Sequence, residues 1–143
     1  MVRDITGNFY VAGNQYIAKY NSIGNFIWQQ SINGFGVNGI DVDSIGNLYV
    51  TGMFYGTVTL GSFSLTSDVD HSDLYLAKFN TSGTIEWITR SYNNSGFAGV
   101  DAITVNEQCY PIIIGRFLDS LKLDNFVFHG TISFLLAKIA NKF

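Results

Sequence analysis

The sequence predicts an all-β fold built from repeated antiparallel units, and three observations lead to that prediction. A ten-residue pattern occurs twice, as DITGNFYVAG around Phe9 and as DSIGNLYVTG around Leu48. No window places apolar residues at helical spacing over three turns behind a capping box, so no helix longer than one turn is expected. Fifteen glycines, a single proline and an aromatic share of 15% are typical of strands joined by tight turns.

Composition bounds the size and class of the protein. A length of 143 residues indicates one domain that can bury a core, and 47% hydrophobic against 13% charged residues excludes a disordered chain. The net charge of -3 provides no basic field for nucleic acid or an anionic membrane. No apolar run has the roughly 20 residues of a membrane span, and MVRDITGNFY lacks the apolar region of a signal peptide. The lone Cys109 allows no internal disulfide, is expected to be a small buried hydrophobe, and leaves the redox compartment open.

The first repeat unit spans about residues 1–36. Its four expected strands are Val2–Asp4, Phe9–Ala12, Gln15–Tyr20 and Phe26–Ile32. Glycine and asparagine separate them, because tight hairpin turns need a positive φ that most other residues adopt only at an energetic cost. Four consecutive strands of this kind predict an antiparallel meander.

The second unit spans about residues 37–96, with strands expected near 40–43, 47–53, 74–79 and 84–91. It adds an arm, Met53–Ser72, between its second and third strands. Val58 and Leu60 alternate there with polar residues before Gly61, so the arm is expected to contain a small extra hairpin.

The third unit spans about residues 97–143. Ile103–Gly115 aligns with Ile40–Gly52, with Cys109 in place of the turn glycine and Pro111 at the start of the second strand, where a proline is tolerated. The arm returns as Phe117–Gly130, and the unit stops where its fourth strand should begin. The third unit is therefore expected to be incomplete.

The strand segments NFYVAG, NLYVTG and PIIIG are apolar at nearly every position instead of every second one. Successive side chains of a strand point to opposite faces, so these segments indicate sheets that are buried on both faces. Four-stranded antiparallel sheets covered on both faces by their neighbours are the blades of a β-propeller. A β-sandwich is the competing fold, but it exposes one face of each sheet and shows cleaner alternation. The chain is thus predicted to be a single domain of about three blades, the last incomplete.

Three motifs carry a resemblance to a known family. The pattern D-x-x-GN-(F/L)-Y-V-x-G, the arm F-x-G-T-V-x-L-G-S-F-x-L-T-S and the segment DLYLAKFN-x-x-G-x-x-x-W resemble the SBBP-type β-propeller repeat. This resemblance implies a propeller fold and says almost nothing about activity. Proteins with such repeats are typically long and often secreted or surface-associated. It therefore favours a binding or structural protein that is secreted, at a surface or in a virion, although the localisation stays undetermined.

Two residue types recur at equivalent positions of the units. The lysines Lys19, Lys78 and Lys138 each follow an alanine and could form a ring of cations for an anionic ligand. Repetition favours a framework lysine, whose stem lies along the next blade while its head stays solvated. Trp28 and Trp87 could be sugar-stacking platforms, but their apolar strands favour packing between blades.

Acidic residues suggest turn caps and one possible metal loop. Asp4, Asp43 and Asn106 are expected to cap the turns that follow them through their side-chain oxygens. The segment DVDHSD could supply calcium with oxygen ligands from Asp68, Asp70 and Asp73, next to His71. It lacks the glycine and the closing glutamate of an EF-hand, and no other unit repeats it. His129 lies far from His71 in the sequence, so no metal site is predicted and calcium binding by the loop stays open.

Motifs that indicate catalysis are missing from the sequence. It contains no G-x-S-x-G elbow, no phosphate-binding glycine loop and no H-E-x-x-H. The apolar surroundings of Cys109 argue against a reactive thiolate. Carboxylates near the inner strands are the only acid–base candidates: Asp4, Asp41, Asp43 and Asp101. No enzyme, catalytic residue or cofactor is predicted.

Two binding functions remain, a protein-interaction or structural scaffold and a glycan-binding propeller. A lectin should repeat an exposed aromatic with an amide or carboxylate, and the nearest candidates, Tyr55, Phe117 and Asn93–Asn94, do not repeat. Assembly is expected in either case, because propellers have about four to eight blades and three would leave two apolar faces exposed. Closed symmetry then predicts a homodimer that forms a six-bladed ring. The alternative is a fragment that completes its ring with the remainder of a larger propeller.

Overall fold

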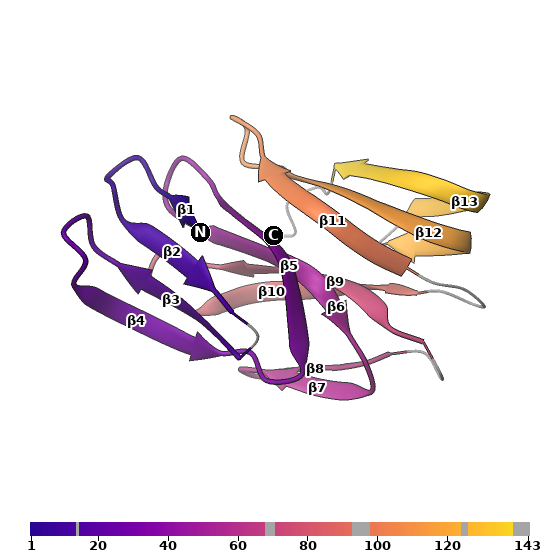
Figure 1. The fold of residues 1–143 in the computed structure, drawn as a ribbon, viewed down its shortest axis with the longest axis horizontal. Helices are drawn as coiled ribbons and strands as arrows, with labels where there is room; N and C mark the ends of the chain where they lie inside the picture. Colours follow the sequence, from indigo (N-terminus) through magenta and orange to yellow (C-terminus); the bar gives the residue numbers. More distant parts are fainter. Residues whose placement is uncertain (14, 68–70, 93–97, 124–125, 139–143) are drawn as a thin grey trace.

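The computed structural model describes residues 1–13, 15–67, 71–92, 98–123 and 126–138. Within these ranges the chain contains strands and turns and no helix, so no helix there could cross a membrane. In the same ranges the strands form a four-stranded, a seven-stranded and a two-stranded antiparallel sheet. The repeat divides the seven-stranded sheet into two blades, and Figure 1 shows the second of the resulting three blades lying between the first and the third. The predicted all-β fold of propeller blades is confirmed.

Blade 1 is a four-stranded meander in the order β1-β2-β3-β4. Its strands are β1 (Val2–Arg3), β2 (Phe9–Ala12), β3 (Tyr16–Tyr20) and β4 (Phe26–Ser31). These bounds agree with the expected strands to within a residue at each end. β1 is short and pairs with β2 at only two positions, Val2 with Tyr10 and Arg3 with Phe9.

Blade 2 has the same meander with longer strands. They are β5 (Phe35–Val42), β6 (Leu48–Phe54), β9 (Asp73–Phe79) and β10 (Ile85–Tyr92), paired in that order. The inner strand β5 begins at Phe35, whereas the sequence suggested a start near residue 40. Almost every residue of β6 and β9 is buried, which confirms that these central strands are covered on both faces.

The arm of blade 2 forms the predicted hairpin, β7 (Thr57–Leu60) paired with β8 (Phe63–Thr66). Gly56 and Gly61 have φ values of 71° and 59°, which lets the chain leave β6 and turn between the two arm strands. Val58 and Leu60 are buried, and the Val58 side chain packs over Gly34 in the connection from blade 1. The hairpin therefore covers the junction of the first two blades.

Blade 3 contains β11 (Ala98–Val105), β12 (Pro111–Leu123) and β13 (Phe126–Lys138). Pro111 begins β12, as predicted. Here the arm extends β12 and β13 as one long pair, with a bulge at Asp119, whose φ is 70°. The far end of β12 pairs with β10 of blade 2, Leu123 opposite Ser91 and Lys122 opposite Tyr92. The place expected for a fourth strand falls outside the described residues.

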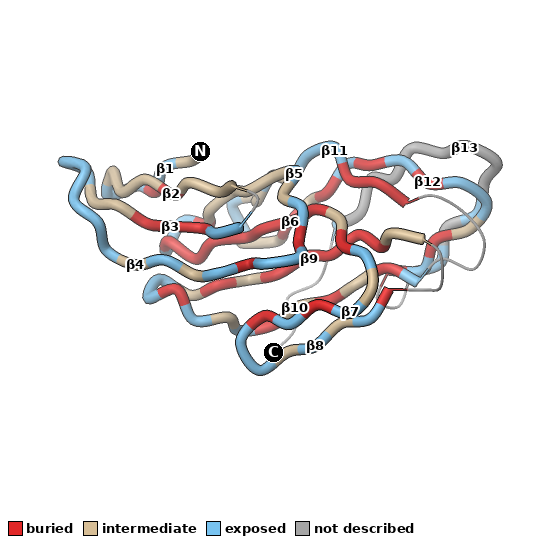
Figure 2. The backbone as a smooth tube through the Cα atoms, turned by 60° about the horizontal axis from the view of Figure 1, so that its bottom comes forward, coloured by how far each residue is buried: buried red, intermediate tan, exposed pale blue. Residues whose placement is uncertain are grey.

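The core consists of two apolar clusters, one on each side of blade 2. Figure 2 shows that buried residues run along β6 and β9 of this blade, whereas β4 is mostly exposed. The cluster between blades 1 and 2 is built around Tyr10, Ile17, Ile32, Phe35, Leu48, Val50, Phe54, Tyr75, Ala77 and Phe79. The cluster between blades 2 and 3 is built around Tyr49, Leu74, Leu76, Trp87, Ala98, Val100, Ile113, Phe117, Leu121 and Leu123. In a sandwich of two sheets, each sheet has one face in water. Blade 2 is instead buried on both faces, which distinguishes stacked blades from a sandwich.

Gly52 and Gly115 end the repeated motif, and each allows the bulged first strand of its blade to lie close against the strand that contains the glycine. β5 is bulged opposite Gly52, and a Cβ added to Gly52 would lie 1.8 Å from the Gly36 carbonyl oxygen. β11 is bulged in the same place, and a Cβ on Gly115 would lie 2.2 Å from the Gly99 carbonyl oxygen. Any side chain at these two positions would push the inner strand off the blade.

Candidate functional site

Turns of one kind join the strands at one end of the blades. Among the described residues this turn occurs five times, at residues 4–8, 21–25, 43–47, 80–84 and 106–110. The first residue is Asp or Asn, and its Oδ1 accepts hydrogen bonds from the backbone N–H groups two and four residues later. In the turn at Asp43 these bonds come from Ile45 and Asn47 and measure 3.1 and 2.8 Å. The capping predicted for Asp4, Asp43 and Asn106 is confirmed.

The fourth residue of each turn adopts a positive φ. It is glycine in four of the described turns, with φ between 84° and 88°, and Cys109 in the fifth, with φ 61°. Its N–H donates to the carbonyl of the first turn residue, at 3.0 Å in the turn at Asp43. Each turn is thus held by its own backbone and by one short polar side chain, which makes this end of the blades rigid.

The carboxylate of Asp4 has a full set of partners. Oδ1 accepts from the Thr6 and Asn8 backbone N–H groups and from the Thr6 hydroxyl at 2.7 Å. Oδ2 accepts from the Asn8 amide at 2.9 Å and the Tyr10 hydroxyl at 3.2 Å. Lys19 Nζ lies 3.7 Å from Oδ2. Burial alone would raise the pKa of Asp4, but the hydrogen bonds from Thr6 and Asn8 outweigh it and lower the pKa to about 2. Asp4 therefore stays ionised at neutral pH and is a poor proton acceptor.

A tyrosine connects each of the first two blades to the next one. Tyr10 donates to the Gly46 carbonyl of blade 2 at 2.8 Å, and Tyr49 donates to the Cys109 carbonyl of blade 3 at 3.2 Å. Burial, aided by nearby aspartates, raises the pKa of both hydroxyls, so they remain protonated donors. We call this contact the tyrosine latch. Ile112 is the aligned residue of blade 3 and has no hydroxyl to offer.

The same packing surrounds both latches. The ring of Tyr10 meets Trp28 edge to face, and Tyr49 meets Trp87 in the same way, each with ring centroids 6.1 Å apart. Trp28 also donates to the Thr81 carbonyl at 3.1 Å. Trp87 is 8% exposed and belongs to the cluster between blades 2 and 3. Both tryptophans therefore pack between blades, as favoured above.

The recurring lysines belong to the same packing. Lys19 Nζ lies 4.8 Å from the centroid of the Tyr10 ring, and Lys78 Nζ lies 5.7 Å from that of Tyr49. Lys138 is exposed and lies 4.3 Å from the centroid of the Tyr110 ring; its cross-strand neighbour is Ile112, where Lys19 and Lys78 each face a tyrosine. The expectation of a solvated head is wrong for Lys19, which is only 7% exposed and is enclosed by Asp4, Tyr10 and the Thr81 carbonyl.

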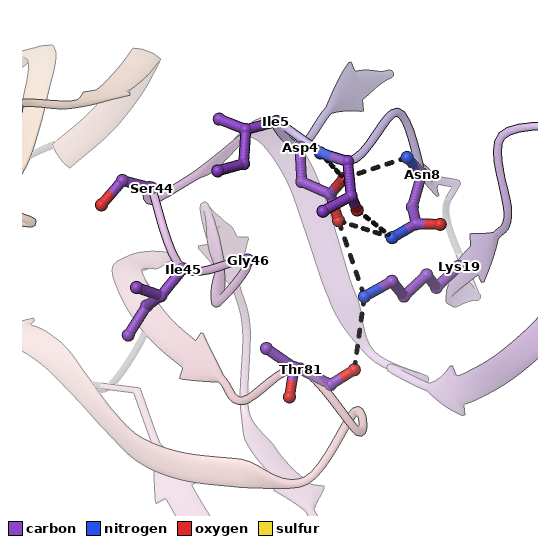
Figure 3. A pocket seen from close by; sticks show the side chains of 9 residues that line it. Asp4, Ile5, Asn8, Lys19, Ser44, Ile45, Gly46 and Thr81 are labelled. Carbon is purple, nitrogen blue, oxygen red and sulfur yellow. Dashed lines mark hydrogen bonds and ion pairs between the residues drawn. The ribbon is translucent and has the colours of Figure 1, made fainter.

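A hollow of about 400 Å³ opens between the turns of blades 1 and 2 (Figure 3). Asp4 and Lys19 lie next to each other on one side, and Thr81 closes another. Ile5 and Ile45 project at its rim and are 82% and 70% exposed. The ion pair of Asp4 and Lys19 leaves no net charge on that side of the hollow. The remaining lining consists of aliphatic side chains at the rim, hydroxyl groups and backbone groups. Such a surface suits binding, and it gives Asp4 no role in proton transfer.

Each of the other inner-strand carboxylates makes a different structural contact. Asp43 holds its own turn and contacts Tyr49. Asp41 accepts from the Val105 N–H at 2.8 Å and so joins β5 to β11. Asp101 pairs with Arg116 on the surface. The structure does not gather Asp4, Asp41, Asp43 and Asp101 into one acid–base site.

The possible metal loop is described only in part. Asp68 and Asp70 lie outside the described residues. Asp73 is fully buried, forms an ion pair with Arg90 and accepts from Ser91 Oγ, so its carboxylate is a structural group. Within the described ranges no three His, Cys, Asp or Glu side chains come together as metal ligands. Cys109 is half-buried in its turn, with Ser44 Oγ 3.7 Å from its sulfur.

The tyrosine latch was not predicted from the sequence. The repeated motif nevertheless contains the pattern that indicates it. Tyr10 and Tyr49 occupy the same position of the motif, each six residues after the aspartate that begins the turn. The candidate sugar-binding residues do not come together either: Tyr55 is exposed, Phe117 is buried, and Asn93 and Asn94 lie outside the described part.

No protein-family model matches the chain. The chain is 30% identical to an uncharacterized WD repeat-containing protein of Acanthamoeba polyphaga mimivirus over an alignment of 123 positions, and this alignment covers 78% of the chain. The aligned part is only 9% of that protein, so the chain spans less than a tenth of its relative's length. WD repeats form propeller blades of four strands. The similarity and the stacked blades agree that the chain is a β-propeller-type repeat, a class of fold that in general serves as an interaction scaffold.

Proposed function

We propose that the chain is a non-catalytic interaction scaffold of the SBBP type whose first partner is a second copy of itself, so that two chains close a six-bladed ring. The observation that carries this proposal is the outer face of blade 1, which we call the head face. It comprises the exposed Phe26 and the half-buried Phe9, Val11 and Tyr20, which surround the fully buried Ala18. These side chains lie opposite to Tyr10 and Lys19, which point toward blade 2, because side chains alternate along each strand.

The head face repeats a surface that the chain itself covers. The aligned residues of blade 2 are Leu48, Val50, Ala77, Phe79 and Ile85. The first four are buried in the cluster beneath blade 1, and Ile85 is partly buried and packs against it. On the head face Phe26 remains 60% exposed, with its ring edge to face against Tyr20. Exposed apolar surface of this kind marks interaction sites. A further blade is therefore the partner that best fits the head face.

The far side of blade 3 is the complementary apolar end. Ile113 and Phe117 point into the cluster shared with blade 2, so Ile112 and Ile114 point away from it. Ile114 and Leu118 are 45% and 42% exposed. Packing this side of one copy on the head face of another, twice, gives six blades, which lies within the four to eight of known propellers.

Sedimentation velocity and light scattering on the purified chain test the proposal. A dimer of twice 15.8 kDa is expected. Phe26→Ser should shift the protein toward monomer, because it places a hydroxyl at the centre of an apolar interface. The control Ile23→Ser changes an isoleucine that is 80% exposed in a turn outside the head face, and it should leave the dimer intact. A stable, well-folded monomer of the parent chain would contradict the ring and favour completion by the remainder of a larger propeller.

A glycan-binding role is the alternative, and the hydroxyl-lined hollow of Figure 3 is the feature that would serve it. Sugar sites need an open aromatic face, whereas Trp28 lies against Gly83, where an added Cβ would meet its ring at 2.7 Å. A glycan array separates the two roles: reproducible binding to one sugar class would favour the lectin, and an empty array the scaffold.

A further inference from the structure

The recurring lysine has a different partner in blade 1 than in blade 2. Lys78 Nζ lies 3.0 Å from Glu86 Oε2, which is the distance of a well-formed ion pair. The residue of blade 1 that aligns with Glu86 is Ile27, which carries no charge. Lys19 therefore lacks the carboxylate that its counterpart in blade 2 uses.

The contacts that Lys19 does make leave much of its hydrogen-bonding capacity unused. Its Nζ lies 3.7 Å from Asp4 Oδ2 and 3.5 Å from the Thr81 carbonyl oxygen. Both distances are longer than the roughly 2.7–2.9 Å of a charge-assisted hydrogen bond. Asp4 Oδ2 already accepts from two closer donors, and the Thr81 carbonyl accepts from an indole N–H at 3.1 Å. Lys19 is thus a buried ammonium whose N–H groups have no close acceptor in the described part of the chain.

This ammonium faces the hollow of about 400 Å³ between the turns of blades 1 and 2. In Figure 3 the Lys19 side chain points into the hollow, with its nitrogen between Asp4 and Thr81. Ile5 and Ile45 lie on the other side of the hollow in this view, and both expose their side chains to solvent. The hollow therefore combines a buried hydrogen-bond donor with an aliphatic rim, a combination typical of binding sites.

The charges around the hollow select an uncharged ligand. Asp4 is ionised at neutral pH, because its hydrogen bonds lower its pKa to about 2, and it lies next to the Lys19 ammonium. An anionic group that approached Lys19 would be repelled by Asp4, and a cationic group would be repelled by Lys19 itself. A neutral oxygen acceptor, such as a peptide carbonyl, can accept from the unused N–H groups without either repulsion.

We propose that this hollow is a binding site for an uncharged, extended peptide segment that carries an aliphatic side chain. A backbone carbonyl of the segment accepts from Lys19, and the aliphatic side chain packs between Ile5 and Ile45, which removes apolar surface from water. A sugar also offers oxygen acceptors, but it has no aliphatic side chain to cover the two isoleucines. The lining therefore favours a peptide.

The site does not depend on the proposed ring. The hollow lies between two blades of one chain, whereas the ring uses the head face and the far side of blade 3. A chain that sediments as a monomer still contains the whole site, so failure of one proposal leaves the other intact.

The test uses N-acetyl-leucine N-methylamide, which has two peptide groups, one aliphatic side chain and no charge. Titrated into the isotope-labelled full chain, it should cause saturable NMR shifts confined to the turns at residues 4–8, 43–47 and 80–84. Lys19→Met keeps the apolar stem and removes the ammonium, so binding should weaken about tenfold or more through loss of a hydrogen bond to a charged group. Lys78→Met is the matched control at the aligned lysine, which does not line the hollow, and it should leave binding unchanged.

The rim of the hollow provides a second variant that does not alter the buried lysine. Ile45→Ser changes an exposed side chain and should weaken binding several-fold. Ile23→Ser changes the exposed isoleucine at the same position of another turn, away from the hollow, and should have no effect. N-acetyl-alanine N-methylamide lacks the larger aliphatic group and should bind several-fold more weakly than the leucine compound.

Methyl glucoside and inorganic phosphate are the competing probes. The proposal is overturned if the leucine compound causes no saturable shifts, or if either competing probe shifts the same turns at lower concentration. It is also overturned if Lys19→Met and Ile45→Ser both bind the leucine compound as the parent does. Stronger binding of the glucoside would favour the glycan alternative, and stronger binding of phosphate would indicate an anion site.

Discussion

At the residue scale, the ion pair of Asp4 and Lys19 shows why charged groups can lie between these blades. Each is almost fully buried, yet the carboxylate accepts from two backbone N–H groups and three side chains, and the ammonium lies over a tyrosine ring. A buried charge is tolerated only when it is paired and hydrogen-bonded in this way. Asp4 is thus a structural ion that fixes a turn and a blade contact.

We expect Asp4→Asn to alter the pH dependence of stability without dismantling the turn. Asn106 holds the equivalent turn of blade 3 with an amide, so the turn geometry survives. The pKa of Asp4 falls from its usual value of 3.8 to about 2 on folding. The carboxylate therefore stabilises the protein fully above about pH 5, by at most about 2.5 kcal/mol before solvent screening. This stability is lost as the pH falls toward 2.

Urea unfolding of the two proteins between pH 7 and pH 2 measures this difference. The parent should be more stable than Asp4→Asn at neutral pH, and the two curves should converge as the pH approaches 2. Parallel curves over the whole range would show that the charge of Asp4 contributes nothing.

At the element scale, the five described turns share one hydrogen-bonding pattern, and their fourth position is the one whose backbone conformation strains any residue except glycine. The fourth residue must adopt a positive φ, which costs a side-chain-bearing residue roughly 1–2 kcal/mol. Four of the described turns use glycine there, and the turn of blade 3 uses Cys109. The thiol contributes only a 3.7 Å contact with Ser44 Oγ to offset the strain.

Cys109→Gly should therefore stabilise the protein by roughly 0.5–1 kcal/mol, since relief of the strain exceeds the greater chain entropy of glycine. Gly46→Ala, at the aligned turn of blade 2, is the matched reverse change and should destabilise. Equilibrium unfolding of both variants checks the pair. A destabilised Cys109→Gly would mean that the thiol makes a contact stronger than its geometry suggests.

At the scale of the whole molecule, the blades are joined in one direction. Each latch tyrosine reaches forward to the turn of the following blade, across 36 residues from Tyr10 and 60 residues from Tyr49. Blade 3 has Ile112 at the position of the latch tyrosine, so it has no hydroxyl to reach a following blade. In the proposed ring, the blade that follows it is blade 1 of the second copy, whose Gly7 carbonyl takes the place of Gly46 and Cys109.

Ile112→Tyr should therefore tighten the dimer if the ring forms. A hydroxyl that reaches the Gly7 carbonyl of the second copy adds one hydrogen bond per interface, worth about 0.5–1.5 kcal/mol. Ile112→Phe adds the ring without the hydroxyl and is the control. Dissociation constants from sedimentation equilibrium should fall for tyrosine relative to phenylalanine. Equal constants would rule out this docking of blade 3 on blade 1.

The sequence was sufficient for features that depend on near neighbours along the chain. The turns followed from Asp or Asn with glycine three residues later, because an Asx side chain bonds its own backbone within four residues. The buried central strands followed from runs such as LYVTG, because alternation of side chains makes burial on both faces visible in composition. The hairpin at Val58 and Leu60 followed in the same way, from two-residue alternation that ends at Gly61.

Tertiary structure alone decided the features that join distant segments. The latch from Tyr10 to Gly46, the burial of the Lys19 head against Thr81 and the pairing of β12 with β10 depend on how far apart and at what angle the blades lie. The extension of blade 3's arm into one long strand pair also depends on that neighbour. Gly13 shows the division most clearly: the sequence marks it as a repeat glycine, but only packing reveals that Gly52 and Gly115 admit a strand and that the place beside Gly13 is open. A repeat pattern records local geometry, whereas contacts between blades arise only when the blades are stacked.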